Sequence, residues 1–272
     1  MTLNGCHGKE IPEMSKKPYV IAFANQKGGV GKTTSAINIA SCVAAMGYSV
    51  LMLDCDPQGN TTSGLGINKK KVSYTMYDVL IDGTSPEDCI IHTKFQNLSV
   101  VPSTINLAGA EFDLIGEERR ERRICEFVEK LGDAYDFVMI DCPPSLGMLT
   151  VNSLTASNGV IIPMQCEYYA LEGLSQLMIS IKKVKERYNP SLTITGILIT
   201  MHNGRLNLAS QVLSEIKKYY SDKLFSVTIP RNVTLSEAPG FGEPINYHDK
   251  YSKGCKAYEA VAEELVRRTV GI

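Results

Sequence analysis

The chain has 272 residues, of which 44% are hydrophobic and 21% are charged, and its formal net charge is −1. This composition is that of a globular domain with a substantial core, and it excludes a disordered or fibrous chain. The longest apolar runs fall far short of the roughly 20 residues that span a bilayer, and the N-terminus has no apolar signal segment. We therefore expect a cytoplasmic protein. The eight cysteines are scattered without any C-x-x-C pair and several lie in apolar segments, so we also expect reduced thiols.

The apolar pattern predicts one domain over residues 18–272, after a flexible tail over residues 1–17 that lacks periodicity. Residues 19–24 predict a strand, residues 33–46 a helix ended by Gly47, and residues 49–53 a second strand. Further strands are expected at 98–101, 137–140, 160–162, 194–199 and 224–229, and helices near 117–131, 170–188, 206–220 and 254–269. Buried strands that alternate with helices predict an α/β fold, with a doubly wound, mostly parallel sheet flanked by helices on both faces.

A glycine-rich turn, K-G-G-V-G-K-T-T, joins the first strand to the first helix. Glycines let consecutive backbone N–H groups point into one concavity, and the helix dipole adds positive potential. In such a turn Lys32 can reach the β- and γ-phosphates, and the Thr33 hydroxyl can ligate Mg²⁺. We therefore predict a P-loop that binds a nucleoside triphosphate, formed by Lys27, Gly28, Gly29, Val30, Gly31, Lys32, Thr33 and Thr34.

Acidic residues follow two of the predicted strands. The second strand ends in D-C-D-P-Q-G-N, which places Asp54 and Asp56 at the carboxyl edge of the sheet, where ligands bind in parallel α/β folds. A capped turn would explain Pro57 and Gly59, but not two acids at a buried edge. The strand at 137–140 leads into Asp141, the expected form of a Walker B element that holds Mg²⁺.

The P-loop departs from the usual pattern, because Gln26 stands where glycine is expected and Lys27 opens the loop. An early lysine can be a solvated loop charge. The whole octet, however, resembles the deviant Walker A loop of the ParA/MinD ATPases, and D-C-D-P-Q-G-N, D-C-P-P-S and P-R-N-V-T-L-S-E-A-P-G follow in the family's order. From about residue 18 to residue 268, the chain resembles Soj-type ParA proteins nearly end to end.

The resemblance implies roles for the phosphate-site residues. Lys27 would reach across a dimer to the partner's ATP and replace an arginine finger, while Lys32 acts within its own subunit. Asp56 would orient the attacking water, so that Lys27, Lys32 and Asp56 are the expected catalytic residues. The expected metal-site residues are Thr33, Asp54 and Asp141.

Two later segments are also assigned through the resemblance. Pro230 and Asn232 are similar to the family's base-contacting loop and would frame the adenine, so the resemblance, and not the P-loop, favours ATP over GTP. The segment 163–173 resembles one that lies at the dimer face. Glu172 within it is equally compatible with stabilising the first turn of a helix.

The resemblance to Soj-type ParA proteins further implies partners. They are a second copy of the chain, bound in an ATP-dependent homodimer, non-specific double-stranded DNA, and a ParB/Spo0J-like protein that stimulates an otherwise slow ATPase. Such a protein would be cytoplasmic and nucleoid-associated. Its DNA contacts would go to phosphates and would therefore weaken strongly with salt.

Candidate DNA contacts are basic residues on several elements. Arg205, in T-M-H-N-G-R, resembles a DNA-binding arginine of the Soj-like subgroup, whereas a second arginine of that subgroup is replaced by Thr234. Lys182, Lys250 and Lys253 are further candidates, and each is also explained as a solvated surface charge.

Two other functions would use the same ATPase. A MinD-like protein would act at a membrane through a basic amphipathic C-terminal helix, but residues 257–272 carry Glu259, Glu263 and Glu264 and lack a bulky apolar face. We therefore expect a docked terminal helix and no membrane partner. The remaining alternative is an ATP switch for protein cargo or regulation, with slow hydrolysis and no need for DNA.

Overall fold

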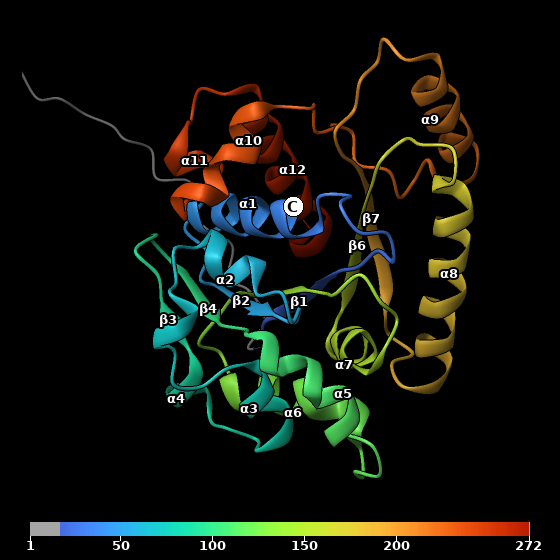
Figure 1. Cartoon of the computed structure of the whole chain (residues 1–272). Coiled ribbons are helices and arrows are strands. Elements are labelled where there is room, and N and C mark those ends of the chain that lie inside the picture. The colour runs from blue at the N-terminus through green and yellow to red at the C-terminus, as the bar shows by residue number, and fades with distance from the viewer. Residues whose placement is uncertain (1–16, 272) are drawn as a thin grey trace, which may run out of the picture.

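A seven-stranded sheet forms the centre of the computed structural model, which describes residues 17–271 (Figure 1). The strand order is β3-β4-β2-β5-β1-β6-β7, and only the edge pair of β3 and β4 is antiparallel. The predicted doubly wound, mostly parallel sheet is therefore confirmed. All of the expected tail except Lys17 lies outside the described residues. The strands are β1 (Tyr19–Phe23), β2 (Val50–Asp54), β3 (Ile91–His92), β4 (Leu98–Val101), β5 (Phe137–Asp141), β6 (Gly159–Met164) and β7 (Thr193–Ile199).

Helices cover both faces of the sheet (Figure 1). One buried cluster joins the sheet to α1, α10, α11 and α12, and a second cluster joins the opposite face to α3, α6, α7, α8 and α9. The α-helices are α1 (Lys32–Ala45), α2 (Asn60–Gly64), α3 (Met76–Ile81), α4 (Pro86–Cys89), α5 (Ala110–Asp113), α6 (Arg123–Leu131), α7 (Met148–Ala156), α8 (Ala170–Arg187), α9 (Asn207–Tyr220), α10 (Val233–Glu237), α11 (Ile245–His248) and α12 (Lys253–Val270). Short 3₁₀ turns are η1 (Lys69–Lys71), η2 (Ile105–Gly109), η3 (Arg120–Arg122) and η4 (Ala238–Phe241).

The central strands read as continuous apolar runs because both of their faces are buried. In β5, Val138 and Ile140 join one cluster, while Phe137 and Met139 join the other. Alternate side chains of a strand point to opposite faces, so a strand covered on both sides needs apolar residues throughout.

The prediction of a strand at 224–229 is wrong. The segment lies beside β7, where Phe225 N donates to the Ile197 carbonyl at 3.0 Å, but it forms only isolated bridges. The ladder is interrupted because the next β7 carbonyl along, that of Ile199, accepts from Ile229 N at 2.8 Å, four residues after Phe225, where a regular ladder would use the residue two positions on. An apolar run identifies burial, but it does not show which acceptor takes each N–H group.

The helix expected near 117–131 begins later, at Arg123. Arg119 has a φ angle of 55°, in the left-handed region, and the η3 turn follows it. A continuous α-helix cannot include that conformation.

The C-terminal helix α12 is docked, as the sequence predicts. Its buried residues include Tyr258, Val261 and Leu265, which belong to the same apolar cluster as α1. Within residues 17–271, no helix has both the length and the apolar character needed to cross a membrane.

Candidate functional site

The turn between β1 and α1 lies at the carboxyl edge of the sheet, and residues 27–29 within it are exposed. Gly29 and Gly31 have φ angles of 73° and 81°, in the region that favours glycine. Chain neighbours aside, no described atom lies within 4 Å of the position that a Cβ would take at Gly28 or Gly29. Gly31 is the N-cap of α1 and offers no side chain to the first-turn N–H groups, so an anion can accept hydrogen bonds there.

Lys32, the first residue of α1, is only 7% exposed. Its Nζ donates to the carbonyl oxygen of Lys27 at 3.2 Å, within the loop. Burial lowers the pKa of Lys32, and the charges of Asp141 and Asp56 oppose that shift. A cation held in this poorly solvated position interacts strongly with a phosphate placed in the loop.

Two buried carboxylates lie on neighbouring strands, because the register of β2 and β5 pairs Asp54 with Asp141. Burial raises the pKa of Asp54 to about 7, and the Asp141 charge adds to the shift. Burial also raises the pKa of Asp141 to about 6, although the hydroxyls of Thr33 and Thr61 and the charge of Lys32 oppose it. A cation beside this pair would relieve both the desolvation and the mutual repulsion.

Asp56 lies two residues beyond the end of β2 and is 7% exposed. Its Oδ1 accepts a hydrogen bond from Gln58 N at 2.9 Å, and its carbonyl accepts one from Gly59 N at 2.8 Å. These bonds fix a tight turn after the acid. The structure thus brings Asp56 to the same edge as the acids of β2 and β5.

The donor set fits Mg²⁺. Asp141 Oδ1 is buried and has no hydrogen-bond partner within residues 17–271, so it is available as a ligand. Those residues contain no cluster of three or more His, Cys, Asp or Glu side chains able to hold a metal. Mg²⁺ commonly takes one or two carboxylates and completes its shell with water and phosphate oxygens, which suits Asp141 with the Thr33 hydroxyl nearby.

Two threonines of α2 were missed by the sequence reasoning. Thr61 Oγ1 donates to Asp141 Oδ2 at 2.9 Å. Thr62 donates to Asp54 Oδ2 through both its N, at 2.8 Å, and its Oγ1, at 2.6 Å. The sequence indicates in part that these threonines lie near the site, because N-T-T directly follows D-C-D-P-Q-G. It does not show that Thr61 would bind Asp141 and Thr62 would bind Asp54, because the fold determines those contacts.

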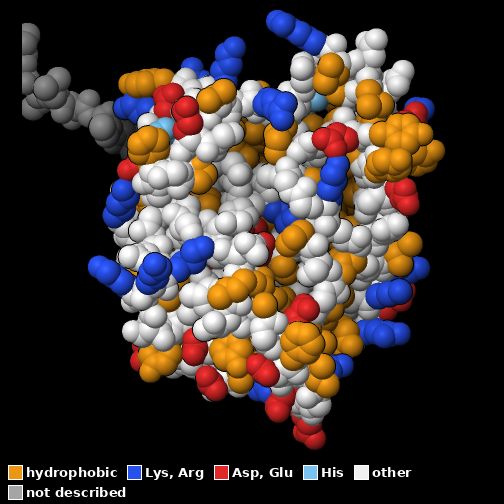
Figure 2. All heavy atoms as spheres, viewed as in Figure 1, with side chains coloured by type: hydrophobic (Ala, Val, Ile, Leu, Met, Phe, Trp, Pro, Cys, Tyr) orange, Lys and Arg blue, Asp and Glu red, His pale blue; other side chains and the backbone are white. Residues whose placement is uncertain are grey.

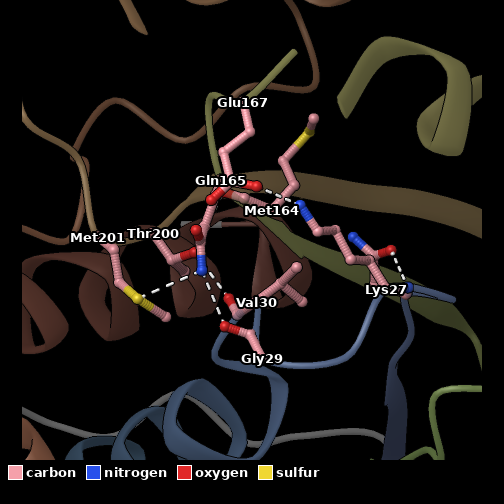
Figure 3. Close-up of polar contacts among 9 residues, drawn as sticks. Lys27, Gly29, Val30, Met164, Gln165, Glu167, Thr200 and Met201 are labelled. Carbon is pink, nitrogen blue, oxygen red and sulfur yellow. Dashed lines mark hydrogen bonds and ion pairs between the residues drawn. The ribbon is translucent and has the colours of Figure 1, made fainter. Parts of the chain in front are cut away.

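Lys27, the early lysine of the P-loop, pairs with Glu167 of its own chain (Figure 3). Their side chains are 49% and 50% exposed, so solvent reaches the pair. Glu167 follows β6 in the segment that the sequence assigned to a dimer face, but the sequence reasoning singled out Glu172 instead. Glu172 is exposed in the first turn of α8.

Residues at the ends of β6 and β7 hold the P-loop through hydrogen bonds (Figure 3). Gln165 Nε2 donates to the Gly29 carbonyl at 2.8 Å, and Thr200 Oγ1 donates to the Val30 carbonyl at 2.7 Å. Thr200 Oγ1 also lies 3.1 Å from the Met164 carbonyl. The loop is therefore ordered by side chains from distant parts of the chain.

Pro230 and Asn232 follow the segment that lies beside β7. Pro230 forms an isolated parallel bridge with His202, just beyond the residues that hold the P-loop. Asn232 caps α10, its Oδ1 accepting from Leu235 N at 3.4 Å. The fold thus places the expected base-contacting loop at the same edge as the P-loop.

The candidate DNA contacts lie on separate elements. Figure 2 shows Lys and Arg side chains at several separate places on one face of the molecule. Lys182 is on α8, where it pairs with Glu186 at 3.8 Å, and Arg205 is exposed before α9. Lys250 and Lys253 are exposed near the start of α12. Within residues 17–271, no hydrogen bond or ion pair joins any two of these four residues.

A family model described as an AAA domain matches residues 18–194, which include the P-loop and all three acids. The Soj protein of Bacillus subtilis, named a sporulation initiation inhibitor, is 51% identical over 246 residues, covering 90% of this chain and 97% of that protein. The chromosome partitioning protein ParA of Myxococcus xanthus is 48% identical over 249 residues, covering 92% of this chain and 88% of that protein. The chain belongs to the ParA/Soj family.

Solved structures agree with this ParA/Soj assignment. A Mycobacterium smegmatis protein named cobyrinic acid a,c-diamide synthase, with bound ADP and magnesium, has a TM-score of 0.81 and 36% identity, covering 92% of this chain and 94% of that one. A Borrelia burgdorferi protein described as a plasmid partition protein, bound to AMPPNP, has a TM-score of 0.78 and 29% identity, covering 93% of this chain and 100% of that one. The fold is that of a P-loop ATPase of the ParA type.

Proposed function

We propose that this ParA/Soj-family chain is an ATP-dependent DNA-partition protein. It binds ATP with Mg²⁺, forms a homodimer, binds double-stranded DNA without sequence preference, and hydrolyses ATP slowly until DNA and a ParB/Spo0J-like partner are present. The observation that carries this proposal is the meeting of Lys32 with Asp54, Asp56 and Asp141 beside the P-loop. The names of the relatives and the nucleotide-bound related structures support it.

Within one subunit, the P-loop amides of residues 27–34 and Lys32 bind the phosphates, and Pro230 and Asn232 frame the adenine. Thr33, Asp54 and Asp141 form the metal site. Mg²⁺, when bound, neutralises charge on the phosphates. Asp56 accepts a hydrogen bond from the attacking water and orients it, while Lys32 stabilises the charge that develops on the transferred group.

Lys27 completes the site of a second subunit. In the structure its ammonium group is held by Glu167 of its own chain, through a half-exposed pair that contributes little to stability. Lys27 can therefore leave this pair at small cost when a stronger anion, the phosphate of a partner's ATP, is presented. Hydrolysis then depends on dimerisation, and ATP acts both as ligand and as timer.

DNA binding follows from the dimer. One subunit offers scattered basic side chains, such as Arg205, Lys182, Lys250 and Lys253, and a dimer doubles their number on one duplex. Such a protein would be cytoplasmic and associated with the nucleoid, and residues 18–272 would act as one ATPase domain. The burial of the apolar face of α12 disfavours a MinD-like membrane anchor. An ATP switch for protein cargo is the remaining alternative.

The proposal is tested with Asp56→Ala protein in ATP and in ADP. Light scattering should show a dimer in ATP but not in ADP. That dimer should bind random-sequence duplex DNA, with an affinity that falls steeply as the salt concentration rises. Asp56→Ala with Arg205→Glu should keep the dimer and bind DNA more weakly. A dimer that ignores DNA at low salt would favour the protein-cargo alternative, and the absence of ATP-dependent dimerisation would contradict the proposal.

A further inference from the structure

Thr61 and Thr62, adjacent residues of α2, bind different acids of the site. Both threonines are completely buried, as are Asp54 and Asp141. Thr61 donates to the acid of β5 at 2.9 Å, and Thr62 donates twice to the acid of β2. Successive residues on a helix point about 100° apart, so two neighbours on α2 can reach two neighbouring strands.

We propose that Thr61 and Thr62 are positioning residues for the metal site, an inference that rests on the proposed function. Thr61 occupies Asp141 Oδ2 and leaves Oδ1 without a partner within residues 17–271, so that one defined oxygen is free for Mg²⁺. Thr62 fixes the neighbouring carboxylate of Asp54 through two hydrogen bonds. Such bonds orient the ligands of a metal and tune its affinity.

The same helix connects the metal site to the acid that orients water. α2 begins at the end of the Asp56 turn, and Gly59, its N-cap, has a φ of 62°. A Cβ at Gly59 would lie 2.7 Å from the Ser103 carbonyl oxygen, while Ser103 N donates to Thr62 Oγ1 at 2.8 Å. The turn is therefore packed against the chain that follows β4. Displacement of Thr61 or Thr62 would move Asp56 as well as the metal acids.

The test uses the full chain and measures ADP affinity by titration calorimetry, in Mg²⁺ and in EDTA. The ratio of the two affinities is the gain that the metal provides. Thr61→Val keeps the shape of the side chain but removes its hydroxyl, so we expect the ratio to fall about tenfold with the EDTA affinity unchanged. Thr61→Ser, which restores the donor, should keep the ratio near the wild-type value.

Thr155→Val is the matched control. Thr155 is also buried in a helix, but its hydroxyl donates to the Val151 carbonyl of its own helix at 2.7 Å. It should leave the ratio unchanged. Thr61→Ala replaces Thr61→Val if the valine is not accommodated.

The outcomes separate this inference from the proposed function. A wild-type ratio above one that is unchanged in the Thr61 variant overturns the positioning role alone. An equal loss in Mg²⁺ and EDTA overturns it too, because that result shows general damage. A wild-type protein that binds no ADP, or binds it without any gain from Mg²⁺, overturns the proposed function together with this inference.

Discussion

Charged residues at the carboxyl edge of the sheet differ from the basic residues of α8, the β7–α9 loop and α12 in how they are held. At the edge, Asp54 and Asp141 are fully buried, Lys32 is 7% exposed, and each of the three has a defined neighbour of opposite charge or a hydrogen-bond donor. On the surface, Lys182 shares an exposed pair with Glu186 at 3.8 Å, and Arg205 lies free of side-chain ion pairs within residues 17–271.

This difference determines what each region can reveal about function. Burying a charge costs free energy unless a partner or a ligand compensates it, so the edge acids and Lys32 point to a ligand. A solvated lysine costs little free energy, so its presence does not point to a ligand. Only the combined charge of several such side chains can attract DNA.

Asp56→Asn should lower the rate of ATP hydrolysis about 100- to 1000-fold, because the amide cannot accept the proton or orient water as the carboxylate does. Asn keeps an Oδ1 acceptor for Gln58 N, so the turn should survive. Phosphate release at saturating ATP measures the effect. Asp133→Asn, at an exposed position, is the control and should behave as wild type; equal activity of the two variants would contradict the role of Asp56.

Lys32→Ala should weaken ATP binding by about 3 kcal/mol, or roughly 100-fold, because a buried cation is removed from a cradle for phosphate. Equilibrium binding of a fluorescent ATP analogue would show the change. Lys70→Ala removes an exposed lysine instead and should have little effect. A Lys32→Ala protein that binds ATP normally would show that the loop amides suffice.

Glu264→Gln and Glu263→Gln compare a buried and an exposed pair on one helix. Glu264 accepts from Ser226 and binds Arg268 Nη2 at 2.5 Å, whereas Glu263 lies 3.9 Å from Arg267 with both side chains exposed. We expect Glu264→Gln to cost about 2 kcal/mol of unfolding free energy, after allowing for solvent screening, and Glu263→Gln less than about 0.5 kcal/mol. Urea unfolding measures both, and equal losses would remove the contrast.

The same pair predicts a pH dependence. Burial alone would raise the pKa of Glu264, but the hydrogen bonds from Ser226 and the charge of Arg268 outweigh it and lower the pKa below its ordinary value of 4.5. Its stabilising contribution is therefore present above pH 4.5 and is lost as the pH falls through the lower, folded-state pKa. The difference between wild type and Glu264→Gln should shrink in that acidic range.

Single surface lysines should have the smallest effects. Lys182→Ala or Lys253→Ala should weaken DNA binding by the ATP dimer slightly and reduce the slope of log affinity against log salt by about 1 for each DNA phosphate that a variant subunit no longer neutralises. ATP affinity should not change. An unchanged slope would show that the residue is only a solvated charge, the alternative explanation that the sequence already allows.

The local sequence was sufficient to predict the parts of the candidate site that come from short continuous segments. The P-loop glycines, Lys32, and the acids at the ends of β2 and β5 all lie at the edge that the alternating strands and helices predict. Contacts between residues that lie far apart in the sequence could not be predicted in this way. Glu167 beside Lys27 is one such contact, and Glu264, which accepts a hydrogen bond from Ser226 N, is another.

Mixing two inactive variants tests whether Lys27 acts on the ATP of a second subunit. A Lys27→Ala subunit retains Asp56, and an Asp56→Ala subunit retains Lys27. If the lysine acts across the dimer, the mixed dimer contains one complete site, and the mixture should hydrolyse ATP at a substantial fraction of the wild-type rate although neither variant does so alone. A mixture as inactive as its components, or an active Lys27→Ala protein, would show that Lys27 does not act across the dimer.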